Sequence, residues 1–113
     1  LNKLSLGDCQ PSNPIWAMRA MIGFDQWLYQ RVAANSEYDR IWATLRAYNG
    51  GLGHWQREAM LARPSQQRQD IDRQCGQASR SVKHCPENLG YPDRILNRLQ
   101  PLYVGWGRTV GVP

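Results

Sequence analysis

The chain has 113 residues, of which 42% are hydrophobic, and this composition fits one globular domain and excludes a disordered chain. The formal net charge of +5 favours an anionic partner such as nucleic acid, anionic lipid or bacterial cell wall, and charge alone does not choose among them. No apolar run approaches the ~20 residues that cross a bilayer, so we expect no membrane span. The chain opens without a methionine or a signal peptide, which predicts a processed product or a fragment of a longer protein.

The apolar residues follow helical spacing throughout and no segment has strand periodicity, so we predict an all-α fold of four to five helices. Residues 1–12 indicate a connector. Ser12-Asn13-Pro14 then combines a capping residue with a proline for the first turn, which predicts a helix from Pro14 to about Asn35. Its expected buried stripe is Ile15, Met18, Ile22, Tyr29 and Val32, widened by Met21 and Leu28.

Ser36-x-x-Asp39 resembles a capping box and predicts a second helix that ends at Asn49-Gly50. A third helix is expected from His54 to Ala62, stopped by Pro64. The second helix is marked by helical spacing of Ile41, Trp42, Leu45 and Tyr48. The inward residues of the third are predicted to be Trp55, Ala59 and Ala62.

Residues 65–84 are polar and rich in Gln and Arg, which indicates either a solvated excursion or an arginine cluster for an anionic ligand. A last helix is expected over Asp93–Tyr103, with Pro92 in its first turn and Pro101 ending or kinking it. Its predicted buried face is Ile95, Leu96, Leu99, Leu102 and Tyr103.

The three cysteines suggest a cross-link in an exported protein. Cys75 and Cys85 bracket a short polar loop, so a disulfide between them is sterically easy. A zinc site from Cys75, His84 and Cys85 is the alternative, although it lacks the paired spacing of structural zinc sites. Cys9 is left over, which predicts a partner in a missing segment or on another chain.

The second predicted helix ends in a glycine-rich turn, the glycine corner, with the sequence Tyr48-Asn49-Gly50-Gly51-Leu52-Gly53. Tyr48 offers a hydroxyl and a stacking face there, and Asn49 offers an amide that both donates and accepts hydrogen bonds. The corner can be a ligand site in which backbone passes close to a sugar. The alternative is a simple chain reversal in which Tyr48 belongs to the core.

Ala47-Tyr48-Asn49-x-Gly51-x-Gly53 resembles the Ala-Tyr-Asn-x-Gly-x-Gly signature of the lysozyme-like lytic transglycosylases, which cleave peptidoglycan glycan strands. Glu87-x-x-x-Tyr91, downstream of it, is similar to a later element of the same family. The resemblance covers about residues 14–104 and also suits phage endolysins. It implies a lysozyme-like fold and cleavage of the β-1,4 bond between N-acetylmuramic acid and N-acetylglucosamine, without a cofactor.

The resemblance assigns substrate binding to Tyr48, Asn49, Gly50, Glu87 and Tyr91. The family's catalytic Glu-Ser pair has no counterpart upstream of Ala47, so residues 1–113 are expected to be one lysozyme-like domain without the lobe that carries the catalytic glutamate. Glycoside cleavage needs a carboxylic acid with a raised pKa beside the scissile bond. Asp25 and Glu58 are the fallback candidates for that acid.

Two other functions remain open. One is a peptidoglycan-binding module without catalysis. The other is a basic helical protein that binds nucleic acid, which the scattered arginines count against because such proteins gather them on one face. The resemblance implies glycan strands rather than nucleic acid as the partner, and the periplasm or cell wall as the location, reached by export or phage delivery.

Overall fold

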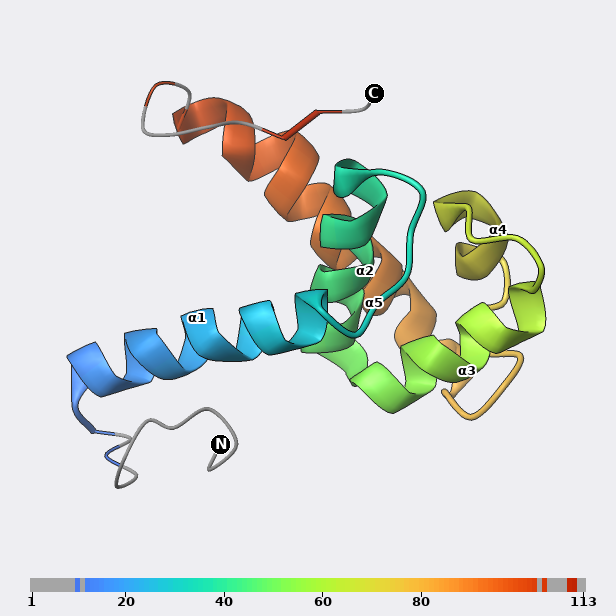
Figure 1. Cartoon of the computed structure of the whole chain (residues 1–113), viewed down its shortest axis with the longest axis horizontal. Helices are drawn as coiled ribbons and strands as arrows, with labels where there is room; N and C mark the ends of the chain where they lie inside the picture. Colours follow the sequence, from blue (N-terminus) through green and yellow to red (C-terminus); the bar gives the residue numbers. More distant parts are fainter. Residues whose placement is uncertain (1–9, 11, 104, 106–109, 112–113) are drawn as a thin grey trace.

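The computed structural model describes residues 10, 12–103, 105 and 110–111. Within these residues all regular structure is helical, which confirms the predicted all-α class (Figure 1). The five α-helices are α1 (Pro14–Tyr29), α2 (Glu37–Gly50), α3 (Leu52–Ala62), α4 (Arg68–Asp72) and α5 (Cys85–Asp93). The 3₁₀ turn η2 (Val82–His84) precedes α5, and the π-helical η3 (Arg94–Leu99) and the 3₁₀-helical η4 (Gln100–Tyr103) follow it.

The capping residues act as the sequence predicts. The Asn13 side chain accepts hydrogen bonds from the backbone N–H groups of Ile15 and Trp16, and Pro14 occupies the first turn of α1. The Ser36 hydroxyl accepts from the N–H of Asp39 at 3.1 Å and starts α2. These bonds satisfy N–H groups that a helix start leaves without partners.

Helix α2 is the centre of the fold and packs against α1, α3 and α5 (Figure 1). Its inner side joins the main core, which consists of Leu28, Val32, Ala43, Ala47, Trp55 and Ile71. A second cluster contains Tyr38, Trp42 and Leu96, so α2 contributes to both. Gly51, with φ of 99°, reverses the chain between α2 and α3, a conformation that residues with a Cβ rarely adopt.

Helix α1 differs from the prediction at both its end and its buried face. It ends at Tyr29 rather than near Asn35. Only its C-terminal half packs on the core, through Phe24, Trp27 and Leu28. The predicted stripe is therefore solvent-exposed in the N-terminal half, where exposure is 66% for Ile15, 60% for Met18, 47% for Met21 and 49% for Ile22.

The C-terminal helical region also differs from the prediction. Helix α5 already begins at Cys85 with Pro86 in its first turn, and Pro92 lies buried inside it. Leu96 is buried as predicted, but Leu99 and Leu102 are 48% and 72% exposed. The helical type changes at Gln100, next to Pro101, in keeping with the break expected from that proline.

None of the described helices is long and apolar enough to cross a membrane, in agreement with the sequence. Residues 1–9 lie outside the described part of the chain, and so does the prediction for Cys9.

Candidate functional site

The tyrosines of the two sequence motifs meet in the fold. The rings of Tyr48 on α2 and Tyr91 on α5 are stacked, with centroids 6.2 Å apart and planes at 20°. Phe24 of α1 contacts the ring of Tyr48 edge-on, with centroids 6.1 Å apart. Tyr48 is 40% exposed and Tyr91 is half-buried. Three helices thus build one aromatic surface that solvent reaches, with two phenolic hydroxyls for hydrogen bonding.

Asp25 lies beside this aromatic surface. Partial burial raises the pKa of its carboxyl group, because removal from water disfavours the charged form. Its buried Oδ1 has no hydrogen-bond partner among the described residues. Burial also raises the pKa of Tyr91, and the nearby Tyr48 and Asp25 raise it further. Asp25 is therefore an electrostatic neighbour of Tyr91, and its carboxyl group is biased towards the protonated form.

A hollow between α1 and α2 opens on the Asp25 carboxyl group. Its volume is about 610 Å³, and it is open to solvent. Polar and apolar groups share its lining, which consists of Asp25, Gln26, Tyr29, Gln30, Glu37, Ile41, Thr44 and Leu45. Mixed linings of this kind bind amphipathic ligands such as sugars. Asp25 thus lines the hollow and is also an electrostatic neighbour of Tyr91.

The side-chain amide of Asn49 has a defined orientation. Asn88 of α5 donates from Nδ2 to Asn49 Oδ1 at 3.2 Å and to the backbone carbonyl of Arg46 at 2.9 Å. Asn88 Oδ1 in turn accepts from Arg46 Nε at 2.9 Å. Because its oxygen is already engaged, the exposed Asn49 presents its NH₂ group as a donor.

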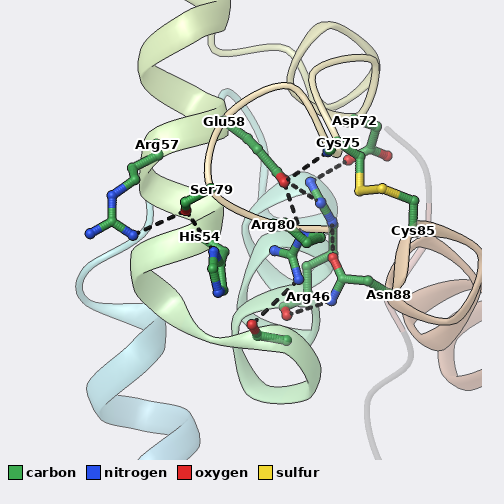
Figure 2. Close-up of polar contacts among 12 residues, drawn as sticks. Arg46, His54, Arg57, Glu58, Asp72, Cys75, Ser79, Arg80, Cys85 and Asn88 are labelled. Carbon is green, nitrogen blue, oxygen red and sulfur yellow. Dashed lines mark hydrogen bonds and ion pairs between the residues drawn. A yellow bond between two sulfur atoms is a disulfide. The ribbon is translucent and has the colours of Figure 1, made fainter. Parts of the chain in front are cut away.

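Glu58, the other fallback acid, is fully buried in a charged network with Arg46 and Arg80 (Figure 2). Its carboxylate accepts hydrogen bonds from Arg46 Nη2 and, at 2.9 Å, from Arg80 Nε. Arg46 also reaches Asp72, at 3.1 Å. Burial raises the pKa of Asp72, and the charges of Arg46 and Arg68 oppose that shift. Glu58 is enclosed by two guanidinium groups and has no surface from which to contact a sugar, so the structure places it in the scaffold.

Two side chains lie close to the Cα atom of Gly50, and a larger residue there would displace them. Arg80 Nη1 donates to its carbonyl oxygen at 3.3 Å. A Cβ added at Gly50 would lie 2.1 Å from Arg80 Nη1 and 2.5 Å from Asn88 Nδ2. The corner therefore depends on a close approach of the Arg80 and Asn88 side chains to the backbone.

Cys75 and Cys85 form the predicted disulfide, with Cα atoms 6.0 Å apart. Both sulfur atoms are bonded to each other, so the alternative zinc site with His84 is wrong. No other group of metal-ligating side chains occurs in the described part of the chain.

Glu87 lies in the first turn of α5, where the helix dipole favours a carboxylate. It forms an exposed ion pair with Arg94 at 2.7 Å. Both charges act on the pKa of Tyr91, so Glu87 belongs to the surroundings of the tyrosine pair. The structure thus brings together Tyr48, Asn49, Gly50, Glu87, Tyr91 and Asp25.

Several arginines make specific contacts with other residues of the chain. Arg46 and Arg80 are buried. The guanidinium groups of three others lie over aromatic rings, in the pairs Arg31–Trp27, Arg40–Tyr29 and Arg68–Trp42. Arg40 and Arg68 are half-buried in these contacts, whereas Arg31 is exposed.

Sequence reasoning missed Phe24, Arg46, Arg80 and Asn88 as parts of the site. Arg46 carried a signal, because it interrupts the helical run that contains Leu45 and Ala47. A charged residue on an apolar helix implies a buried partner. Asn88 lies inside the Glu87–Tyr91 motif, but its pairing with Asn49 depends on how α5 packs on α2.

No family model, curated protein sequence or solved structure matches this chain. The functional argument therefore rests on the site itself.

Proposed function

We propose that this chain acts on peptidoglycan glycan strands at the surface formed by Tyr48, Asn49 and Tyr91, as a lysozyme-like lytic transglycosylase or muramidase of phage-lysis type. One observation carries the proposal. The two motifs that resemble that family are far apart in the sequence, and their tyrosines stack on each other in the fold. Asp25, an electrostatic neighbour of Tyr91, lines an open hollow. A chain reversal alone does not require this convergence.

Asp25 is the acid in this proposal. A general acid in glycoside cleavage must be protonated near neutral pH, and partial burial shifts the pKa of Asp25 in that direction. Its proton passes to the glycosidic oxygen as the bond from that oxygen to C1 of N-acetylmuramic acid breaks. Its Oδ1 is buried without a hydrogen-bond partner among the described residues, which favours the protonated carboxyl group that a general acid needs.

The tyrosines and Asn49 bind the sugar. The exposed face of Tyr48 packs on a pyranose ring, and the Asn49 NH₂ donates to an acceptor such as the N-acetyl carbonyl oxygen. The resemblance further implies that the N-acetyl carbonyl oxygen bonds to C1 as the glycosidic bond breaks. The O6 hydroxyl then displaces that oxygen and returns its proton to the Asp25 carboxylate, which gives the 1,6-anhydro product; in a muramidase, water takes the place of O6.

The test is turbidity clearing of outer-membrane-stripped Gram-negative cells by purified protein whose intact mass is 13.0 kDa, with product analysis by mass spectrometry. Asp25→Asn should abolish clearing. The matched control is Asp70→Asn on α4, which should clear as the parent does. Clearing by Asp25→Asn at the parent rate would rule out Asp25 as the acid.

A binding module without catalysis is the second candidate. The observation that favours it is the placement of Glu58, which leaves Asp25 as the one unpaired carboxyl group beside the tyrosines among the described residues. Retention of the chain on insoluble peptidoglycan without release of soluble fragments would identify this function.

A location in the periplasm or cell wall belongs to the proposal. The Cys75–Cys85 disulfide supports it, because such cross-links persist in oxidising compartments.

A further inference from the structure

The loop between Cys75 and Cys85 contributes Arg80 to the polar network around Glu58 (Figure 2). The disulfide closes the loop at its base across a sequence separation of 10. Within the loop the backbone N–H of Gly76 reaches Glu58 at 3.4 Å, and the Ser79 hydroxyl contacts His54 Nδ1 at 2.6 Å.

Arg80 is a buried residue of this loop and makes contacts in the protein interior. Its side chain is 2% exposed, with Nε on the Glu58 carboxylate and Nη1 on the carbonyl oxygen of Gly50. The same guanidinium group thus joins the buried acid to the backbone that follows Asn49. Its Nη2 has no partner among the described residues. The bonds from Nε and Nη1 are therefore the two that orient the guanidinium group.

We propose that Arg80 is a positioning residue for the glycine corner, and that the Cys75–Cys85 disulfide places the candidate site under redox control by holding Arg80 in the network. The effect on glycan binding rests on the proposed function. The effect on the geometry of the corner does not.

The physical argument follows from loop entropy. While the disulfide is intact, the short loop has few conformations, so little entropy is lost when Arg80 is buried. Reduction by an external dithiol breaks the Sγ–Sγ bond, gives two electrons and two protons to the two cysteines, and leaves the dithiol as a disulfide. The opened loop gains conformations in which Arg80 is in solvent.

Release of Arg80 has two consequences at the corner. The Glu58 carboxylate keeps Arg46 but loses its second guanidinium group, and the Gly50 carbonyl loses its side-chain donor. The backbone after Asn49 then samples more than one conformation. We infer a site that is assembled in an oxidising compartment and loosened in a reducing one.

The experiment compares four proteins: the parent, the double variant Cys75→Ser/Cys85→Ser, the single variant Arg80→Met, and the triple variant that combines all three substitutions. Backbone amide NMR signals of Asn49, Gly50 and Gly51 report the geometry of the corner, and titration with N-acetylglucosamine oligomers reports binding. Circular dichroism verifies that each protein is folded.

We expect the double cysteine variant and Arg80→Met to shift the same three amide signals and to weaken oligomer binding by about tenfold, the effect of losing roughly one well-placed hydrogen bond. The triple variant should resemble Arg80→Met, because both changes remove the same contact. Reduction of the parent should reproduce the shifts, and reoxidation should reverse them.

Two further variants keep the test sharp if Arg80→Met does not fold. Arg80→Lys retains every charge and the disulfide, but its single ammonium group cannot contact the Glu58 carboxylate and the Gly50 carbonyl oxygen in the same way, so it should shift the same three signals. Arg73→Met removes an arginine whose side chain is 73% exposed and should leave the corner signals unchanged.

Strictly additive effects in the triple variant, or corner signals that do not respond to reduction, would overturn the proposal. If the signals respond as expected while the parent binds no oligomer, the positioning role of Arg80 stands and the proposed function fails. The two inferences are thereby separated.

Discussion

Asn88 on α5 holds Asn49 on α2, with a distance of 3.2 Å from Asn88 Nδ2 to Asn49 Oδ1. The same Nδ2 donates to the backbone carbonyl of Arg46. One buried amide therefore links the solvent-facing end of α2 to the charged network below it. This link gives the candidate site a fixed donor rather than a freely rotating side chain.

Asn49→Ala should weaken binding of N-acetylglucosamine oligomers or muropeptides by about tenfold, because one positioned donor is lost. The fold should persist, since Asn49 is exposed and Asn88 keeps its bonds to Arg46. Isothermal titration calorimetry measures the change. Gln69→Ala, at an exposed position on α4, is the matched control and should bind as the parent does.

Tyr91→Phe should also weaken glycan binding, because the stack on Tyr48 survives while the hydroxyl is lost. Tyr38→Phe is the comparison and should bind as the parent does, since Tyr38 is buried and its hydroxyl donates to Asn97. If Tyr91→Phe and Asn49→Ala both bind muropeptides as tightly as the parent, the assigned site is wrong.

Asp25→Asn should stabilise the fold at pH 7 while removing activity. Burial raises the pKa of Asp25 in the folded state, so the folded state binds more protons than the unfolded state at pH values between 3.8 and the raised pKa. The parent therefore loses stability as pH rises through that window, and the asparagine variant does not. Urea unfolding across pH should show a stability gap at pH 7 that closes below pH 3.8. A gap independent of pH would contradict the raised pKa.

Arg46→Met should destabilise the protein by about 3–5 kcal/mol, because Glu58 and Asp72 lose a shared buried partner. Chemical denaturation at neutral pH measures this loss. Arg73→Met, which breaks an exposed pair with Asp70, should change stability by less than about 1 kcal/mol. If both substitutions lower the free energy of unfolding equally, burial does not increase the contribution of Arg46 to stability.

The sequence predicts the parts of the fold that depend on local chemistry. Asn13 and Ser36 mark their helix starts because capping involves only neighbouring residues. The disulfide is likewise set by a short loop. The exposure of Ile15 and Met18 could not be predicted, because helical periodicity shows which residues share a face but not whether another element covers it.

In the candidate site, too, the sequence predicts individual residues, whereas their contacts depend on how the helices pack. Tyr48 and Tyr91 were named from their motifs, and their contact depends on how α5 packs on α2. Asp25 and Glu58 were equivalent fallback acids on sequence grounds. The structure separates them, because Glu58 lies between two arginines and Asp25 lines an open hollow.

The buried network also limits how this chain can change over evolutionary time. A single substitution at Arg46 or Glu58 leaves a charge enclosed without its counterpart, whereas joint replacement by apolar residues of similar volume can be tolerated. One-step mutational paths through these positions therefore pass through unstable intermediates. Among descendants of a common ancestor, Arg46, Glu58 and Arg80 should be inherited or lost together, while the exposed arginines drift independently.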